Sequence, residues 1–295
     1  MTLRSNGEKT FGLVNGLLLI LFSASLLFPF VNLLAVSFTH GASEHLSNVM
    51  LWPRPFTTKS YETVLSQRDL YTGYFNTIIR TVFGTAATLV VLLGAAYPLS
   101  KRYLPHRNLY TSIFVFTLFF NGGLIPTYLV IRDLGLIDTR LVLILHNLAP
   151  AFYLLVMRNF LMGIPAELED SARIDGANDI TILVRIVIPM STPVIATIGL
   201  WSAVWHWNSW FDALIYARRL DLSVLQIWLR RIIITANDYM MAEATRDIDA
   251  MLGLPTKPET LNAAAIFVAI APILIVYPFI QKYFVKGVLI GSLKG

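Results

Sequence analysis

Long apolar runs alternate with short polar segments along the whole chain. Each run is near or above the ~20 residues that a helix needs to cross a bilayer, and the runs cover 11–36, 74–99, 109–131, 141–162, 186–205 and 261–283. Hydrophobic residues make up 56% of the 295 residues and charged residues only 14%, whereas soluble domains carry about 25% charged residues. The pattern predicts an all-α membrane protein with six transmembrane helices.

Helix breakers and charges refine this picture. The third run is interrupted at 121–126 by Asn-Gly-Gly-Leu-Ile-Pro, and the fourth by Asn147 and Pro150. The short loop 100–108 is basic, and short basic loops lie on the cytoplasmic side of a membrane. We therefore expect both termini to be cytoplasmic, with 1–10 as a tail and 11–295 as a single transmembrane domain.

The most polar island between the apolar runs lies at 165–189. Pro165 suits the first turn of a helix, and Gly176 suits the position after the helix, where φ is positive. Carboxylates favour the positive end of a helix dipole, and three follow Pro165 directly: Glu167, Glu169 and Asp170. We expect a short amphipathic helix, a glycine joint and a second helix from 177 to about 188. Such a helix suits a groove on a soluble partner; a solvated loop between two spans is the simpler alternative.

The island reads Glu-Leu-Glu-Asp-Ser-Ala-Arg-Ile-Asp-Gly-Ala at 167–177 and closes with Ile-Val-Ile-Pro at 186–189. This sequence resembles the EAA loop of ABC-importer permeases, a cytoplasmic helix that couples the permease to its ATPase. The resemblance places Asp170, Ser171 and Ala172 at the Glu-Ala-Ala positions, and the first two depart from the family letters while keeping the acid and the small size. It implies these coupling residues: Glu167, Glu169, Asp170, Ser171, Ala172, Asp175, Gly176 and Pro189.

Two further stretches resemble carbohydrate permeases. One is the C-terminal sequence, with Tyr-Pro-Phe-Ile-Gln-Lys-Tyr at 277–283 and Ile-Gly-Ser-Leu-Lys-Gly at 290–295; the other is Trp-Asn-Ser-Trp-Phe at 207–211. The resemblance covers about 74–295, with a family core at 74–283. Within the family, the chain most resembles the smaller permease of the maltose-type class, in the branch that imports complex oligosaccharides.

The resemblance implies an importer subunit in the bacterial cytoplasmic membrane. Its partners would be a homologous second permease, two ATPase subunits that bind ATP and magnesium, and an external solute-binding protein. The chain has no Walker A loop, no cysteine and no metal-ligand spacing among its histidines, so we expect no catalytic residue, cofactor or metal in it. It lacks the basic and aromatic pattern of nucleic-acid binding.

Aromatic side chains crowd the outer end of the fifth run. They suit stacking on sugar rings in a translocation path or an interfacial aromatic belt, and they are Trp201, Trp205, Trp210 and Phe211. Asn208 would hydrogen-bond in a cavity. Arg80, in the second run, would either face the path or extend to the membrane surface.

Hydrophobic spacing predicts an amphipathic helix at 223–234 on the outer face. Four arginines bracket this helix: Arg218, Arg219, Arg230 and Arg231. They would meet the binding protein or an acidic sugar such as a uronate chain, or else lipid phosphates or nearby acids. The alternative function is a secondary transporter driven by an ion gradient, but the sequence shows neither mid-membrane charges nor an inverted repeat to support it.

Overall fold

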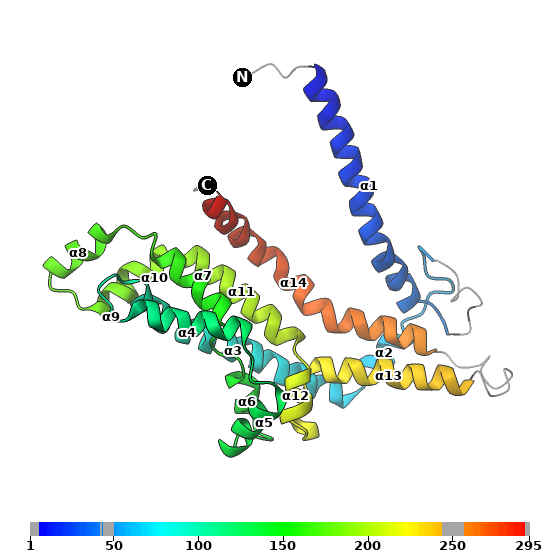
Figure 1. Cartoon of the computed structure of the whole chain (residues 1–295). Coiled ribbons are helices and arrows are strands. Elements are labelled where there is room, and N and C mark those ends of the chain that lie inside the picture. Colours follow the sequence, from blue (N-terminus) through cyan, green and yellow to red (C-terminus); the bar gives the residue numbers. More distant parts are fainter. Residues whose placement is uncertain (1–5, 42, 44–49, 244–256, 293–295) are drawn as a thin grey trace. The chain divides into compact units, whose positions relative to one another are not determined.

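The computed structural model describes residues 6–41, 43, 50–243 and 257–292, and this part of the chain is helical without a β-strand (Figure 1). The prediction of an all-α fold is confirmed for these residues. The helices are α1 (Asn6–Ser37), α2 (Lys59–Leu65), α3 (Arg68–Ser100), α4 (Arg107–Phe119), α5 (Leu124–Asp133), α6 (Arg140–Leu145), α7 (Ala151–Leu161), α8 (Ala166–Ile174), α9 (Asp179–Ile182), α10 (Ile188–Met190), α11 (Thr192–Asn208), α12 (Phe211–Tyr216), α13 (Leu225–Glu243) and α14 (Pro258–Ser292), with a π-helix at Leu183–Val187 and a 3-10 turn at Leu220–Leu222.

Three helices are long and apolar enough to cross a membrane by themselves. They are Thr10–Ser37 in α1, Arg68–Ser100 in α3 and Pro258–Val276 in α14. Three helix pairs meet the same test only together, and they are bent by 117° (α4 and α5), 72° (α7 and α8) and 80° (Asp179–Met190 and α11). The described chain therefore has three to six candidate spans. The predicted interruptions at 121–126 and near Pro150 are confirmed as helix breaks.

The fifth apolar run is bent, whereas we expected one span over 186–205. α11 begins only at Thr192, and an 80° bend separates it from the helical turns before it. At the bend, the backbone N–H of Ser191 still donates to the Val187 carbonyl at 2.9 Å. Pro193, near the start of α11, has no N–H to extend that hydrogen-bond ladder. The sequence pattern did not reveal the bend because the residues on both sides of it are apolar.

The chain divides into two compact units, residues 1–68 with 229–271 and residues 69–228 with 272–295. In the first unit, most apolar side chains of α1 are exposed. Near its C-terminal end, Ser37 Oγ lies 2.8 Å from the hydroxyl of Tyr61. Ser60 Oγ on α2 donates to Thr260 Oγ1 on α14 at 3.0 Å. The single domain expected over 11–295 stays a prediction.

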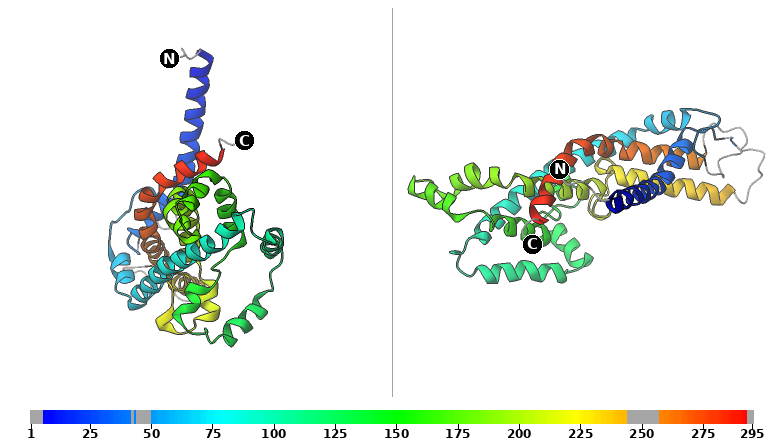
Figure 2. Two further views of the ribbon diagram at one scale, coloured as in Figure 1. Left: turned by 90° about the vertical axis from the view of Figure 1, so that its left-hand side faces the viewer. Right: turned by 90° about the horizontal axis from the view of Figure 1, so that it is seen from above.

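In the second unit, α3, α7 and α11 share an apolar core that includes Leu92, Leu154 and Ile198. Gly84 on α3 makes room for the imidazole of His206 on α11, because a Cβ at position 84 would lie 2.4 Å from that ring. Figures 1 and 2 show α8 and α9 at one end of this unit, beyond the ends of α7 and α11. The island nevertheless contributes Ile182 and Val187 to the apolar core, so only its α8 end projects beyond that core.

Candidate functional site

The polar island folds as its local sequence predicts. α8 ends at Ile174 with Asp175 as its C-cap residue, and Gly176 follows with φ +84°. The N–H of Gly176 donates to the Arg173 carbonyl at 3.0 Å and that of Ala177 to the Ala172 carbonyl at 2.9 Å, the paired bonds of a Schellman C-cap. The predicted helix and glycine joint are therefore confirmed. Pro165 lies one position earlier than expected, as the N-cap residue.

The outer face of α8 is a row of exposed side chains one helical turn apart. Glu167, Asp170, Ser171 and Ile174 follow the spacing i, i+3, i+4 and i+7, and all are exposed. Ile174 is 87% exposed, and Ile180, beyond the glycine joint, is 74% exposed. Two large aliphatic side chains are therefore exposed on either side of the glycine joint. We refer to the four residues on α8 as the outer row.

The inner face of α8 packs against its own chain. The carboxylate of Glu169 is buried and forms an ion pair with the ammonium of Lys101, just after α3. Ala172 packs against the apolar core. Arg173 donates to the hydroxyl of Tyr103 at 2.9 Å and to Asp179 at 3.0 Å, and the hydrogen bond to Asp179 raises the pKa of its guanidinium.

The eight predicted coupling residues therefore have different surroundings. Glu169 and Ala172 face the interior of their own chain, so their direct contact with a partner stays only a prediction. Asp175, Gly176 and Pro189 are exposed beyond the outer row.

Arg80 is buried rather than extended toward the membrane surface, which corrects one sequence-based expectation. Its side chain is 0% exposed and forms an ion pair with Asp212 on α12. It also donates to the Ser209 carbonyl at 3.1 Å, and its guanidinium carbon lies 5.8 Å from the ring centre of Trp205. A buried charge needs such partners because of its desolvation cost. The sequence signal for the pair was Asp212, an acid directly after the aromatic cluster.

Near its N-terminal end, α3 also forms hydrogen bonds with residues that follow α12. The amide of Asn76 donates to the carbonyls of Asp221 and Ser223 at 2.8 and 2.9 Å. The hydroxyl of Thr77 accepts a hydrogen bond from the N–H of Leu225 at 2.9 Å. With the Arg80 ion pair, these contacts fix the segment 209–225 to α3.

Two groups of neighbouring aromatic rings include tryptophans of α11. In the first, Trp201 lies with its ring centre 5.8 Å from Phe152 and 5.6 Å from Tyr153. The second joins α11 to α5 and α12 through ring-centre distances of 5.5–6.3 Å, and its members are Trp205, His146, Tyr216 and Tyr128. Two predicted path residues, Trp201 and Trp205, thus belong to larger ring groups.

The other predicted path residues lie elsewhere. Trp210 and Phe211 contact each other edge to face at 5.6 Å. The amide of Asn208 donates to the Val204 carbonyl of its own helix at 2.9 Å and is exposed. The role of Asn208 in a cavity along the translocation path stays a prediction.

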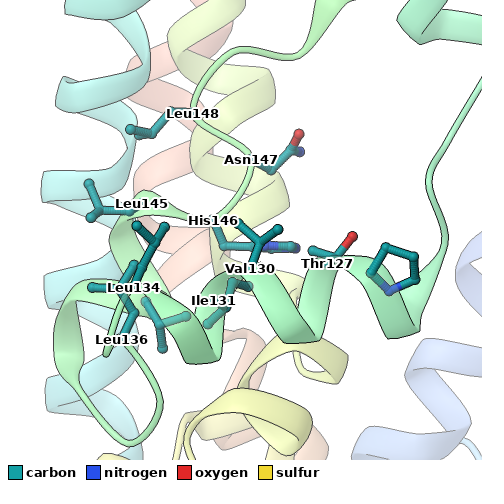
Figure 3. Close-up of a pocket in the computed structure, with 11 residues that line it drawn as sticks. Thr127, Val130, Ile131, Leu134, Leu136, Leu145, His146, Asn147 and Leu148 are labelled. Atoms are coloured by element: carbon teal, nitrogen blue, oxygen red, sulfur yellow. The ribbon is translucent and has the colours of Figure 1, made fainter.

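A largely apolar cavity of about 500 Å³ lies beside His146. Figure 3 shows side chains of α5 and of the segment 145–148 facing it. Its few polar groups come from Thr127, His146 and Asn147. Nothing in the sequence pattern marked this cavity, because its lining comes from short helices separated by a loop. In the described residues, no group of three or more His, Asp or Glu side chains could hold a metal ion.

The predicted helix near 223–234 is confirmed as part of α13. Arg219 forms an exposed ion pair with Asp221 at 2.9 Å, and Arg218 donates to the Tyr128 hydroxyl at 3.0 Å. The alternative of pairing with a nearby acid thus holds for Arg219, whereas the guanidinium of Arg218 contacts a tyrosine. Arg230 and Arg231 are exposed on α13.

Sequence and structure comparisons identify similar proteins over nearly the whole chain. No family model matches the sequence. It is 39% identical over 278 residues to the polygalacturonan/rhamnogalacturonan transport system permease protein YtcP of Bacillus subtilis, covering 94% of this chain and 96% of that protein. It is also 39% identical over 287 residues to protein LplC of the same organism, covering 97% and 96%. A solved bacterial ABC transporter involved in the import of the acidic polysaccharide alginate has a chain of 36% identity, with a TM-score of 0.85 over 96% of this chain and 100% of that one.

Proposed function

Because the chain belongs to the sugar permeases of ABC transporters, we propose that it is a membrane-spanning subunit of an importer for acidic oligosaccharides. In this proposal six transmembrane helices place both termini in the cytoplasm of a bacterium. The partners are a second permease, two ATPase subunits and an external solute-binding protein. ATP and magnesium bind in the ATPases, and this chain contributes no catalytic group.

The observation that carries the proposal is the outer row on α8. Its i, i+3, i+4, i+7 spacing is the pattern by which a helix fills a groove on another protein. The row ends in Ile174, whose side chain is 87% exposed, and burial of an isoleucine in a groove contributes roughly 1.5–3 kcal/mol. Closure of an ATPase dimer would displace α8, and the helices attached to it would rotate as rigid bodies.

Co-purification tests this proposal against the alternative of an ion-gradient transporter. Expressed with its ATPase, the chain should retain that ATPase through detergent extraction and affinity purification. Uptake into proteoliposomes should require ATP inside and the binding protein outside. Uptake by the purified chain alone, driven by a sodium or proton gradient, would contradict the proposal.

The acidic substrate is proposed from two relatives. One is named for polygalacturonan and rhamnogalacturonan, and the solved neighbour is involved in importing an acidic polysaccharide. We predict that the assembled importer takes up oligogalacturonides or alginate oligosaccharides at least tenfold (about 1.4 kcal/mol) faster than neutral oligosaccharides of the same length. Uptake of labelled sugars into proteoliposomes measures this ratio, and equal rates would remove the acidic specificity while leaving the permease assignment intact.

Gly176 gives a test of the joint after α8. Its φ of +84° strains a residue with a β-branched side chain by ~1 kcal/mol or more, so Gly176→Val should raise the ATP hydrolysed per sugar imported. Gly135→Val is the matched control, because Gly135 also has positive φ (+68°) and open space around it but lies outside the island. We expect normal coupling in the control. Equal coupling in both variants would mean that the joint does not transmit movement.

A further inference from the structure

Two charged contacts attach the inner face of α8 to the residues directly after α3. Glu169 pairs with Lys101, and Arg173 donates to the hydroxyl of Tyr103 at 2.9 Å. Positions 169 and 173 are one helical turn apart on α8 and share a face. The inner face of α8 therefore has a two-point connection to the end of α3, which terminates at Ser100.

The Lys101–Glu169 contact is the more buried of the two. Among the acidic side chains of the island, all of which the structure describes, Glu169 alone is buried, while Glu167, Asp170, Asp175 and Asp179 are exposed. The ammonium of Lys101 also lies 4.4 Å from the ring centre of Tyr97 on α3. Separating a buried ion pair leaves two desolvated charges without partners, which is costly. The contact is therefore expected to stay closed when α8 moves.

α3 runs without interruption from this contact to the opposite part of the unit. It has 33 residues and so extends about 50 Å at 1.5 Å per residue. Near its N-terminal end it holds the segment 209–225 through Asn76, Thr77 and the buried pair of Arg80 with Asp212. One continuous helix thus joins the coupling helix α8 to that segment.

We infer that Lys101 and Glu169 are positioning residues that make α3 move with α8 and so carry the movement of α8 to the segment 209–225. The inference rests on the proposed function, in which α8 is the helix that the ATPase displaces. The ion pair would transmit movement within the chain, whereas the outer row would contact the ATPase. Neither Lys101 nor Glu169 needs to contact the ATPase.

A reversible cross-link tests this role. The chain has no cysteine, so Lys101→Cys with Glu169→Cys places the only two thiols of the chain at the contact. Removing both charges together avoids a buried charge without a partner. Before linking, we expect the sugar imported per ATP hydrolysed to fall at least about fivefold. A short bis-methanethiosulfonate reagent, which links the two cysteines through disulfide bonds, should restore it, and reduction of those disulfides should abolish it again.

The matched control is Lys59→Cys with Glu62→Cys, which replaces the exposed ion pair on α2. It should import normally with and without the link. Normal coupling in the unlinked 101/169 variant, or no recovery on linking, would overturn the inference. The ATPase recovered with each variant is measured in parallel. Loss of the ATPase from the unaltered chain would instead contradict the proposed function.

Discussion

Replacing Asp212 with alanine is expected to destabilise the permease far more than removing an acid from its surface. The guanidinium of Arg80, fully buried, would lose its ion-pair partner, and arginine stays charged at any pH that the protein tolerates. Breaking a buried ion pair in this way costs roughly 3–5 kcal/mol. Arg80→Ala should cost a similar amount, because it leaves the buried carboxylate of Asp212 with only the Ser209 hydroxyl at 2.8 Å.

Thermal unfolding of the purified protein in detergent measures this effect. The matched control is Asp133→Ala, which removes an acid from an exposed ion pair with Arg132 and should change stability by less than about 1 kcal/mol. Replacing both partners, Arg80→Met with Asp212→Leu, should recover most of the loss. Equal midpoints for Asp212→Ala and Asp133→Ala would show that the buried pair contributes nothing to stability.

Ser171→Trp and Ile174→Glu are expected to remove the ATPase from the complex. Both side chains lie in the outer row, where a groove must accept small or apolar groups. Losses at the centre of an interface reach ~2 kcal/mol or more, about thirtyfold in affinity. Because both residues are exposed, the amount of permease in the membrane should not change.

Affinity capture of the ATPase by each variant in detergent gives the measurement. Thr63→Trp on α2 is the matched control for Ser171→Trp. Both hydroxyls donate to the carbonyl four residues earlier, Thr63 at 2.9 Å and Ser171 at 2.8 Å, and both side chains are exposed. Undiminished ATPase recovery with the Ser171 and Ile174 variants would place the docking surface elsewhere.

The sequence predicts the local structure of the island well because its determinants are local. Three acids follow Pro165, and a glycine stands where the helix must end, so α8 and its Schellman cap follow from neighbouring residues. The division of α8 into an inner and an outer face does not follow from neighbouring residues. Glu169 faces inward because Lys101 lies beside it, and no periodicity in the island indicates a partner 68 residues earlier.

Arg80 shows the same limit within an apolar run. From the sequence, a lone arginine near the end of a span is expected to extend toward the membrane surface. The structure instead pairs it with Asp212, which is 132 residues away. The bend at Ser191 also escapes the hydropathy pattern, because the residues on either side of it are apolar. Contacts between distant segments, rather than local propensities, decide these features.

Site-specific photocross-linking tests whether the outer row on α8 touches the ATPase. Because the chain has no cysteine, Ile174→Cys and Phe119→Cys each carry a single benzophenone label. Their native side chains are almost equally exposed, 87% and 86%, but Phe119 lies at the end of α4, outside the island. Illumination of the assembled importer should join the label at position 174 to the ATPase, while the label at 119 should give no such product. No ATPase adduct at 174, or equal adducts at both positions, would mean that the outer row does not dock the ATPase.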